Sequence, residues 1–489
     1  VLVLLTAGTV VVSSVEPPVQ RRARTESVEV VGATAVCPDV RQDAGLYSTR
    51  ISVGAAPLPV GRTATGGAIS TTLVQGLDTT TKQVPIKQPG QVAVGLGTTT
   101  DENGVVVAAT GALATGLEVE QVARVNDGRF RGLAGLRCEA PKRDAWFIGA
   151  STGIVDFSVL VLANVDDSPA TVDITAFGRS GGVDPRPGQG LTIAPHTRKV
   201  IALDTLAPDR QYLVVHVRSR QGRVVAALRD ARYSGNKPLG FDYVPQAVPP
   251  ATTVVVPGIP QGPGFRGLVI GNPSNDDTVV SVQVTLRDGQ FVPAGMDEVH
   301  VPAGHTAMVD LTKVTDASPL TVTVKSPGVP VVAGGFLLEA QAFQLGGIRE
   351  TAYAGSTLPL SGPALLTDLV IDRPTESTLI LSAPDTEATV VVTPITVLGA
   401  AGSPPEPRVV TIPAGRTVAF RLSTFFPPGT KAQLAVEVRP QGDSGPVFAT
   451  RYLRERGGRG TLATLLALKG PAQLVVRRAA AQDDEAAYP

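Results

Sequence analysis

The sequence predicts an all-β protein, a tandem array of four immunoglobulin-like or related β-sandwich domains. The first observation is a repeated strand–turn–strand segment, seen at Val410–Leu422, Val299–Leu311, Leu191–Leu203 and, in a weaker form, Val84–Leu96. Copies roughly a hundred residues apart fit the size of one sandwich domain. The second observation is the composition, because 52 Gly and 41 Pro among 489 residues are typical of short strands joined by many turns.

Two further segments recur in the last three repeats. A strand, an acidic turn and a second strand are found at Phe157–Phe177, Leu268–Leu286 and Leu379–Val392. Two strands with alternating apolar residues are found at Tyr212–Leu228, Leu320–Phe336 and Leu434–Tyr452. We interpret all three segments as hairpins, which with a first strand gives about seven or eight strands per domain, as in a sandwich. The order of the strands is not predicted.

The predicted organisation is a hydrophobic segment, four sandwiches and a disordered tail. Their boundaries are 1–15 for the segment, 30–141, 142–249, 250–361 and 362–478 for the sandwiches, and 479–489 for the tail. The joints between domains are rich in proline, as in 244–250 and 358–363. Because proline-rich joints are short and stiff, we expect a rod-like array.

Residues 1–15 (VLVLLTAGTVVVSSV) are apolar or small, and the chain turns polar at Glu16. The segment is shorter than the ~20 residues that a membrane-spanning helix needs. It predicts a signal-peptide core or a membrane anchor, with a buried N-terminal strand as the alternative. We therefore expect an extracytoplasmic protein, either membrane-anchored or secreted.

Cys37 and Cys138 are the only cysteines and form no CxxC motif. The pair is compatible with buried thiols, metal ligands or one disulfide, and with only four histidines a zinc site is poorly supported. Export favours the disulfide, which would join the first and last strands of the first domain. Closing a loop of about 100 residues stabilises a fold by roughly 4–5 kcal/mol in the chain-entropy model.

Several of these features together resemble a known family. They are the hydrophobic segment, the Cys37 and Cys138 pair, Cys138-x-x-Pro141 followed by Trp146-Phe147-x-Gly149, and the repeated sandwich units. The chain resembles an uncharacterised actinobacterial exported family of unknown function. The resemblance implies residence in the cell envelope, possible work alongside glycosyltransferases of wall-polymer assembly, and no catalytic residues.

Two glycine-containing motifs have the spacing of catalytic or cofactor-binding loops. Gly149–Gly153 matches GxSxG, which needs a serine raised on a turn between a strand and a helix. Gly262–Gly267 matches GxGxxG, which needs a helix to open at the motif. Each motif is followed by a predicted strand, so we interpret both as turns.

Acidic and histidine residues recur at equivalent turns. The acidic pairs are Asp166-Asp167, Asp276-Asp277 and Asp385 with Glu387, while His196 and His305 occupy matching positions in the repeated segment. Paired carboxylates can bind calcium, but Asx residues are also preferred by turns. We favour solvated turns for the acids and exposed turn residues for the histidines.

The charge and the motifs limit the classes of function that the sequence supports. The 43 Lys and Arg balance 43 Asp and Glu, which argues against a nucleic-acid binder. The sequence therefore predicts a non-enzymatic extracytoplasmic scaffold or accessory binding protein with no metal or cofactor. The family resemblance implies that its partner is an envelope protein such as a membrane glycosyltransferase, or wall glycan.

Two alternatives make structural predictions. A polysaccharide-binding module would cluster exposed aromatic side chains, and the candidates are Trp146, Tyr47, Tyr233 and Tyr243, although we expect Trp146 in the core. A hydrolase would place Ser151, or a pair of acids, beside a histidine in a cleft.

Overall fold

The protein divides into two compact units, one formed by Val30–Gln473 and the other by Val1–Glu29 with Leu474–Pro489. The computed structural model describes residues 25–28, 30–39, 47–58, 66–74, 81–95, 104–125, 128, 130–315, 318–339, 349–371, 375–400, 404–425, 432–457, 460–470 and 475–478. The described part of the smaller unit is a two-stranded sheet, in which β1 (Thr25–Val28) pairs with β37 (Val475–Arg478). The predicted hydrophobic segment 1–15 and tail 479–489 lie outside the described residues. Within the described ranges, no helix has both the length and the apolar character needed to cross a membrane.

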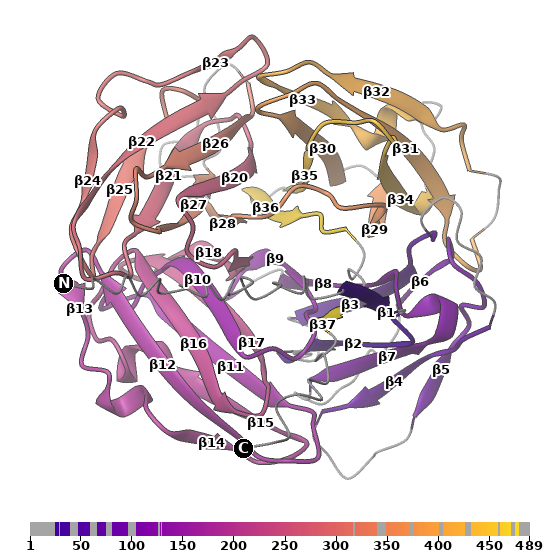
Figure 1. The fold of residues 1–489 in the computed structure, drawn as a ribbon, viewed down its shortest axis with the longest axis horizontal. Coiled ribbons are helices and arrows are strands. Elements are labelled where there is room, and N and C mark those ends of the chain that lie inside the picture. The colour runs from indigo at the N-terminus through magenta and orange to yellow at the C-terminus, as the bar shows by residue number, and fades with distance from the viewer. Residues whose placement is uncertain are drawn as a thin grey trace, which may run out of the picture. The chain divides into compact units, whose positions relative to one another are not determined.

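The larger unit contains four β-sandwiches, each with two antiparallel sheets (Figure 1). We call the sheet that holds a sandwich's first strand its first sheet, and the other its second sheet. In the first sandwich, the first sheet consists of β2 (Gly32–Cys37), β7 (Val105–Thr110), β4 (Ile69–Leu73) and β5 (Lys82–Val84). Its second sheet consists of β6 (Val92–Val94), β3 (Tyr47–Ala55), β8 (Leu117–Val125) and β9 (Gly132–Arg137). In the second sandwich, the first sheet consists of β10 (Asp144–Ala150), β16 (Leu213–Gln221), β12 (Ala170–Gly178) and β14 (Leu191–Ile193), extended by β13 (Gly181–Gly182) and β19 (Gln246–Ala247). Its second sheet consists of β15 (Thr197–Ala202), β11 (Phe157–Asn164), β17 (Val225–Ser234) and β18 (Lys237–Val244).

The third and fourth sandwiches are built alike. The sheets of the third are β20 (Thr253–Ile259), β26 (Leu320–Lys325), β22 (Thr278–Thr285) and β24 (Val299–Val301), extended by β23 (Gln290–Phe291), then β25 (Thr306–Asp310), β21 (Gly264–Gly271), β27 (Val332–Glu339) and β28 (Glu350–Gly355). Those of the fourth are β29 (Ala364–Ile371), β34 (Ala432–Pro440), β31 (Ala388–Thr396) and β32 (Arg408–Ile412), then β33 (Arg416–Arg421), β30 (Thr375–Ala383), β35 (Phe448–Gly457) and β36 (Gly460–Ala467). Short 3₁₀ helices connect some strands, at Gly111–Leu113, Arg186–Gly188, Leu203–Thr205 and Leu422–Phe425.

The strand order is the same in all four sandwiches. Leaving out the two-residue strands, each first sheet takes the first, sixth, third and fourth strands of its sandwich, and each second sheet takes the fifth, second, seventh and eighth. The all-β fold with four sandwiches is thereby confirmed, including the first sandwich, whose sequence repeat is weak. The order differs from the ABED and CFG sheets of an immunoglobulin domain, so the sandwiches are of a related type.

The prediction of hairpins was wrong at all three repeated segments, because the two strands of each lie in different sheets. In Phe157–Phe177, β11 is in the second sheet and β12 in the first, and in Tyr212–Leu228, β16 is in the first sheet and β17 in the second; the later copies of both segments are the same. In Val410–Leu422, β32 pairs with β31 in the first sheet, whereas β33 pairs with β30 in the second. The same crossing between sheets occurs at the other three copies. Alternating apolar residues give one buried face in a hairpin and also in two strands that face each other across a sandwich. The pattern therefore cannot distinguish the two connections.

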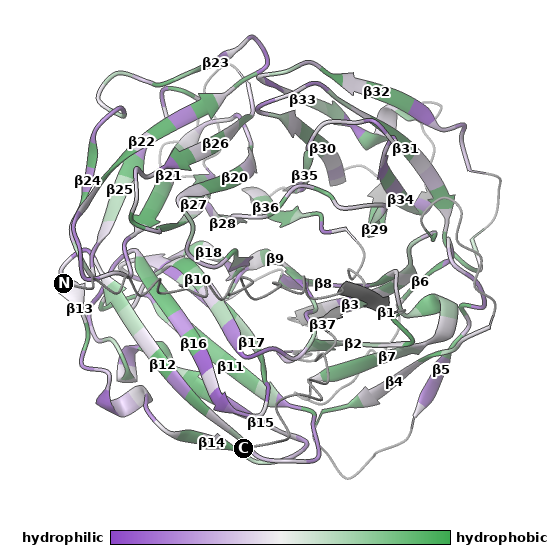
Figure 2. Ribbon diagram, in the orientation of Figure 1, coloured by the Kyte–Doolittle hydropathy of each residue, from purple (hydrophilic) through white to green (hydrophobic). Residues whose placement is uncertain are grey.

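The rod-like arrangement was also wrong, because each sandwich packs its first sheet on the second sheet of the next, and the fourth packs on the first. Apolar residues from both partners share one cluster at each contact: Val36 with Val225, Trp146 with Val269, Ile259 with Ile380, and Leu365 with Val92. Sheets covered on both faces have nearly continuous buried runs. In β17 every residue but the last is buried, and Figure 2 shows the hydrophobic stretches along the strands.

The last strands of the four sandwiches meet one another. β9 contacts β18, β18 contacts β28, β28 contacts β36, and β36 contacts β9. The approach is close enough to need glycine: a Cβ on Gly240 would lie 2.5 Å from the backbone nitrogen of Thr351, and one on Gly135 would lie 2.8 Å from Thr464 Oγ1. The buried carboxylate of Asp242 accepts hydrogen bonds there from the Gly135 amide and the Thr464 hydroxyl, both at 3.0 Å.

Buried ion pairs connect the sandwiches to one another. Their members lie in different sandwiches, and the pairs are Arg229 with Asp39 (2.7 Å), Arg50 with Asp368 (2.7 Å), Arg451 with Glu120 (3.1 Å) and Arg131 with Glu350 (3.8 Å). Except for Arg50, which is partly exposed, their side chains are buried. Because charges are buried only when paired, these contacts favour one arrangement of the four sandwiches over others.

Cys37 and Cys138 form a disulfide. Cys37 ends β2 and Cys138 directly follows β9, so the bridge joins the first and last strands of the first sandwich. The two residues are 101 positions apart in sequence, and their Cα atoms are 4.7 Å apart. This is the staple expected from the sequence.

Candidate functional site

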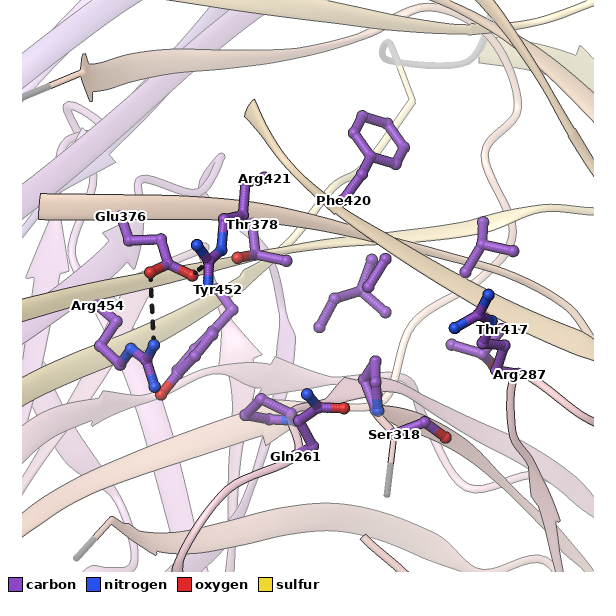
Figure 3. A pocket seen from close by; sticks show the side chains of 15 residues that line it. Gln261, Arg287, Ser318, Glu376, Thr378, Thr417, Phe420, Arg421, Tyr452 and Arg454 are labelled. Carbon is purple, nitrogen blue, oxygen red and sulfur yellow. Dashed lines mark hydrogen bonds and ion pairs between the residues drawn. The ribbon is translucent and has the colours of Figure 1, made fainter. Parts of the chain in front are cut away.

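An open pocket of about 560 Å³ lies between the third and fourth sandwiches (Figure 3). Ligand pockets usually measure about 300–1,000 Å³. The fourth sandwich contributes residues of β30, β33 and β35, and the third contributes three connections between strands. The lining residues are Pro260, Gln261, Arg287, Ser318, Pro319, Glu376, Thr378, Ile380, Thr417, Val418, Ala419, Phe420, Arg421, Tyr452 and Arg454.

The pocket is fixed in place where β33 meets the third sandwich. β33 is the edge strand of its sheet, so one row of its backbone groups has no neighbouring strand. The end of β22 occupies part of that row: the Thr417 amide donates to Leu286 O at 3.0 Å, and the Thr417 hydroxyl donates to Thr285 O at 2.8 Å. This wall is therefore held by hydrogen bonds from both sandwiches.

The opposite wall is supported by a buried arginine. Arg266 is fully buried, donates to Pro260 O at 3.2 Å, and forms an ion pair with Glu339. It thereby holds the Pro260–Gln261 turn that lines the pocket. Burial raises the pKa of Glu339 even though Arg266 opposes the shift, and burial together with Glu339 raises the pKa of Tyr452. The Tyr452 phenol is consequently neutral at physiological pH.

The described residues that line the pocket carry more positive than negative charge. The Glu376 carboxylate lies 2.9 Å from Arg421 Nε and 3.4 Å from Arg454 Nη2, so one acid is shared by two guanidinium groups. Arg287 is exposed and forms no ion pair with any residue that the structure describes. Figure 3 shows Glu376, Arg421 and Arg454 at one end of the pocket and Arg287 at the other. Such a lining favours a ligand with negative groups.

Ser151, the serine of the GxSxG motif, lies in a buried hydrogen-bond network. Its hydroxyl donates to Asp156 Oδ2 at 2.6 Å and lies 3.2 Å from Arg210 O. All four histidines follow Ser151 in the sequence, and the first two bond elsewhere, His196 to Asp167 and His216 to Asp144, both at 2.8 Å. The structure does not bring Ser151 to an imidazole.

The GxGxxG motif leads into a strand and not a helix, as expected, but the strand begins earlier than expected: β21 starts at Gly264, so the last four residues of the motif lie in the strand and not in a turn. Its Arg266 is the buried arginine that supports the pocket wall. Two of the acidic turns have partners in their own sandwich: Asp166 pairs with Arg223 at 2.7 Å, and Asp277 accepts the Ala303 amide at 2.8 Å. Among the described residues, no three His, Cys, Asp or Glu side chains are grouped so that they could hold a metal ion.

The expected match between His196 and His305 needs a correction. His196 has a φ of 51°, close to the 67° of Gly304 and Gly415. The turn before it is one residue shorter, so His196 takes the left-handed position that glycine takes in the later copies. The side chain of His305 instead lies against Gly181 of the second sandwich, 3.0 Å from where a Cβ would stand.

The aromatic candidates for sugar binding are mostly buried. Trp146 is in the contact between the second and third sandwiches, and its ring stacks on His216 with centroids 3.8 Å apart. Tyr233 and Tyr243 are buried as well, and the side chain of Tyr47 is outside the described residues. These three buried rings do not form an exposed platform.

Sequence reasoning missed the residues of the pocket. Glu376, Arg421 and Arg454 come from three strands that are brought together only by the sheet order. One signal was present: β35 (FATRYLRERG) carries charged residues inside an apolar strand, as do β8 (LEVEQVARV) and β17 (VAALRDARYS). Charges at such positions need buried partners.

Comparison with known families gives one match. Residues 93–423 match DUF5719, a family of unknown function. The chain belongs to this family. The DUF5719 region holds Arg287, Glu376 and Arg421 of the pocket, and it ends before β35. The expected membership of a family of unknown function is thereby confirmed. No curated protein sequence matches the chain.

Proposed function

We propose that this DUF5719 protein is a non-enzymatic accessory binding protein or scaffold of the cell envelope. The observation that carries the proposal is the set of buried ion pairs that connect four sandwiches into one unit with an open pocket at one of its contacts. A frame of this kind holds a binding surface in a constant geometry, which lowers the entropic cost of binding a partner.

The contact between the first and fourth sandwiches supports the frame most strongly. Arg50 reaches Asp368 at 2.7 Å across 318 positions of sequence, and the hydroxyls of Ser52 and Thr367 are 2.7 Å apart. Arg451 adds a hydrogen bond to Glu120 from the same contact. Closing so long a stretch of chain is unfavourable in entropy, so the contact persists only because it buries these partners and the apolar residues around them.

The extracytoplasmic part of the proposal is supported by the disulfide. Disulfides persist in oxidising compartments outside the cytoplasm and are rare inside it. The apolar sequence of residues 1–15 points the same way. Mass spectrometry of the protein from its host, without reducing agent, should find Cys37 linked to Cys138; two free thiols would argue against this compartment.

The partner is tested by affinity purification from membranes with the full chain as bait. We expect recovery of an envelope protein, such as a membrane glycosyltransferase of wall-polymer assembly. Recovery of wall glycan without protein would favour the alternative, a polysaccharide-binding protein. Exclusive recovery of cytoplasmic proteins would refute the proposal.

A further inference from the structure

We propose that the pocket between the third and fourth sandwiches binds an acidic glycan, a carbohydrate chain that carries carboxylate or phosphate groups. The site deepens the proposed function, on which it rests only for its setting in the envelope. The first argument is size: a space of about 560 Å³ is far larger than a single small anion needs, whereas it suits a segment of a chain.

The second argument is the placement of the charges. Arg421 and Arg454 lie at one end and Arg287 at the other, and among the described residues that line the pocket Glu376 is the only carboxylate (Figure 3). A ligand with a single negative group would leave one end without a partner. A chain with negative groups on successive units can engage both ends at once, and guanidinium groups bind carboxylate and phosphate oxygens well.

The third argument is the lining between the two ends. Thr378, Ser318 and Gln261 supply hydroxyl and amide groups, whereas the ring of Phe420 points away from the other lining side chains and packs on Phe425 and the core of the fourth sandwich (Figure 3). Sugar hydroxyls need donors and acceptors of this kind. A purely inorganic polyanion would bind the arginines but would leave these hydroxyl and amide groups without a partner on the ligand.

The fourth argument is that a negative group of a ligand can compete with Glu376 for Arg421. Arg421 is 61 % exposed and pairs with a carboxylate that is 25 % exposed, so the ion pair is partly in water. Exposed pairs contribute little to stability, and a ligand carboxylate or phosphate can share Arg421 without a large loss. Arg287 has no described ion-pair partner to give up.

Binding is measured by isothermal titration calorimetry of the full chain with three probes of equal length: an oligogalacturonate, a glycerol-phosphate oligomer and a neutral malto-oligosaccharide. We expect binding of at least one acidic probe, weakened by salt, and no comparable binding of the neutral one. The carboxylate and phosphate probes distinguish the two sources of negative charge. Equal binding of the neutral probe, or binding of no probe, would overturn the inference.

Substitutions assign the binding to this pocket. Arg287→Ala and Arg421→Ala are each expected to lower the affinity for the acidic probe by at least about tenfold. The unfolding midpoint should stay unchanged. Arg186→Ala is the matched control, because Arg186 is also exposed and paired with one acid, Asp184, in the second sandwich. Unchanged binding in both pocket variants would refute the site. The proposed function would still stand if the Arg287→Ala chain recovered the same envelope protein from membranes.

Discussion

Arg451 Nη1 lies 3.1 Å from Glu120 Oε2, and both side chains are fully buried although 331 positions of sequence separate them. Arg451 belongs to the fourth sandwich and Glu120 to the first. Arg451 also donates to Asp368 O at 2.8 Å within its own sandwich. The pair therefore ties the end of the chain's tandem array to its beginning.

Replacing only one residue of this ion pair should lower the free energy of unfolding. Arg451→Met leaves Glu120 buried without its partner, and Glu120→Leu does the same to Arg451; each should destabilise the fold by about 3–5 kcal/mol. The double variant should lose much less than the sum of the two, because neither charge is left alone. Denaturant unfolding of the four proteins checks this, and additive losses would show that the two residues do not interact.

Glu118 should make stability depend on pH. Burial raises the pKa of Glu118 from 4.5 to about 7, although the neighbouring Arg137 opposes the shift. Because the folded state holds the proton more tightly than the unfolded state, this group's contribution is present below pH 4.5 and is lost as the pH rises through 7. The loss amounts to about 3 kcal/mol.

Glu118→Gln should remove that part of the pH dependence. Relative to the wild type, the variant should gain stability between pH 4.5 and 7 and hold the gain above it. Unfolding free energies across this range, measured on both proteins, give the comparison. A wild type and variant with parallel pH profiles would contradict the raised pKa.

The meeting of the last strands should not tolerate a methyl group at Gly240. This residue has a φ of 99°, and its Cβ would lie 2.5 Å from the Thr351 nitrogen. Gly240→Ala should therefore cost well over the 1–3 kcal/mol of backbone strain alone. Gly235 is the matched control, since it has a φ of 57° but open space around it. Equal losses in Gly235→Ala and Gly240→Ala would contradict the close approach.

The sequence predicted the units of the fold but not their connections. Thr417 and its neighbours recur with the spacing of one domain, so the repeat identified four sandwiches. The same alternation is satisfied whether β32 and β33 pair with each other or face each other, so the crossing between sheets stayed hidden. The closed packing was also hidden, because proline joints are equally compatible with a rod and with sheets covered on both faces.

The candidate site could be predicted even less. Glu376, Arg421 and Arg454 are separated by up to 78 positions in sequence, and Arg287 comes from another sandwich. Only the contact between the third and fourth sandwiches brings them together. A charged residue inside an apolar strand, such as Arg454, signals a buried partner, but it does not name that partner.

The closure of the fourth sandwich on the first is tested most directly by a zero-length carbodiimide cross-link. Lys469 of the fourth sandwich forms an ion pair with Glu139, which follows the first, and Lys142 lies 2.9 Å from the same carboxylate. Peptide mass spectrometry of the treated protein should find Glu139 joined to Lys469 as well as to Lys142, and Lys469→Arg should abolish only the first link. A protein that forms the Lys142 link but never the Lys469 link would contradict the closed arrangement.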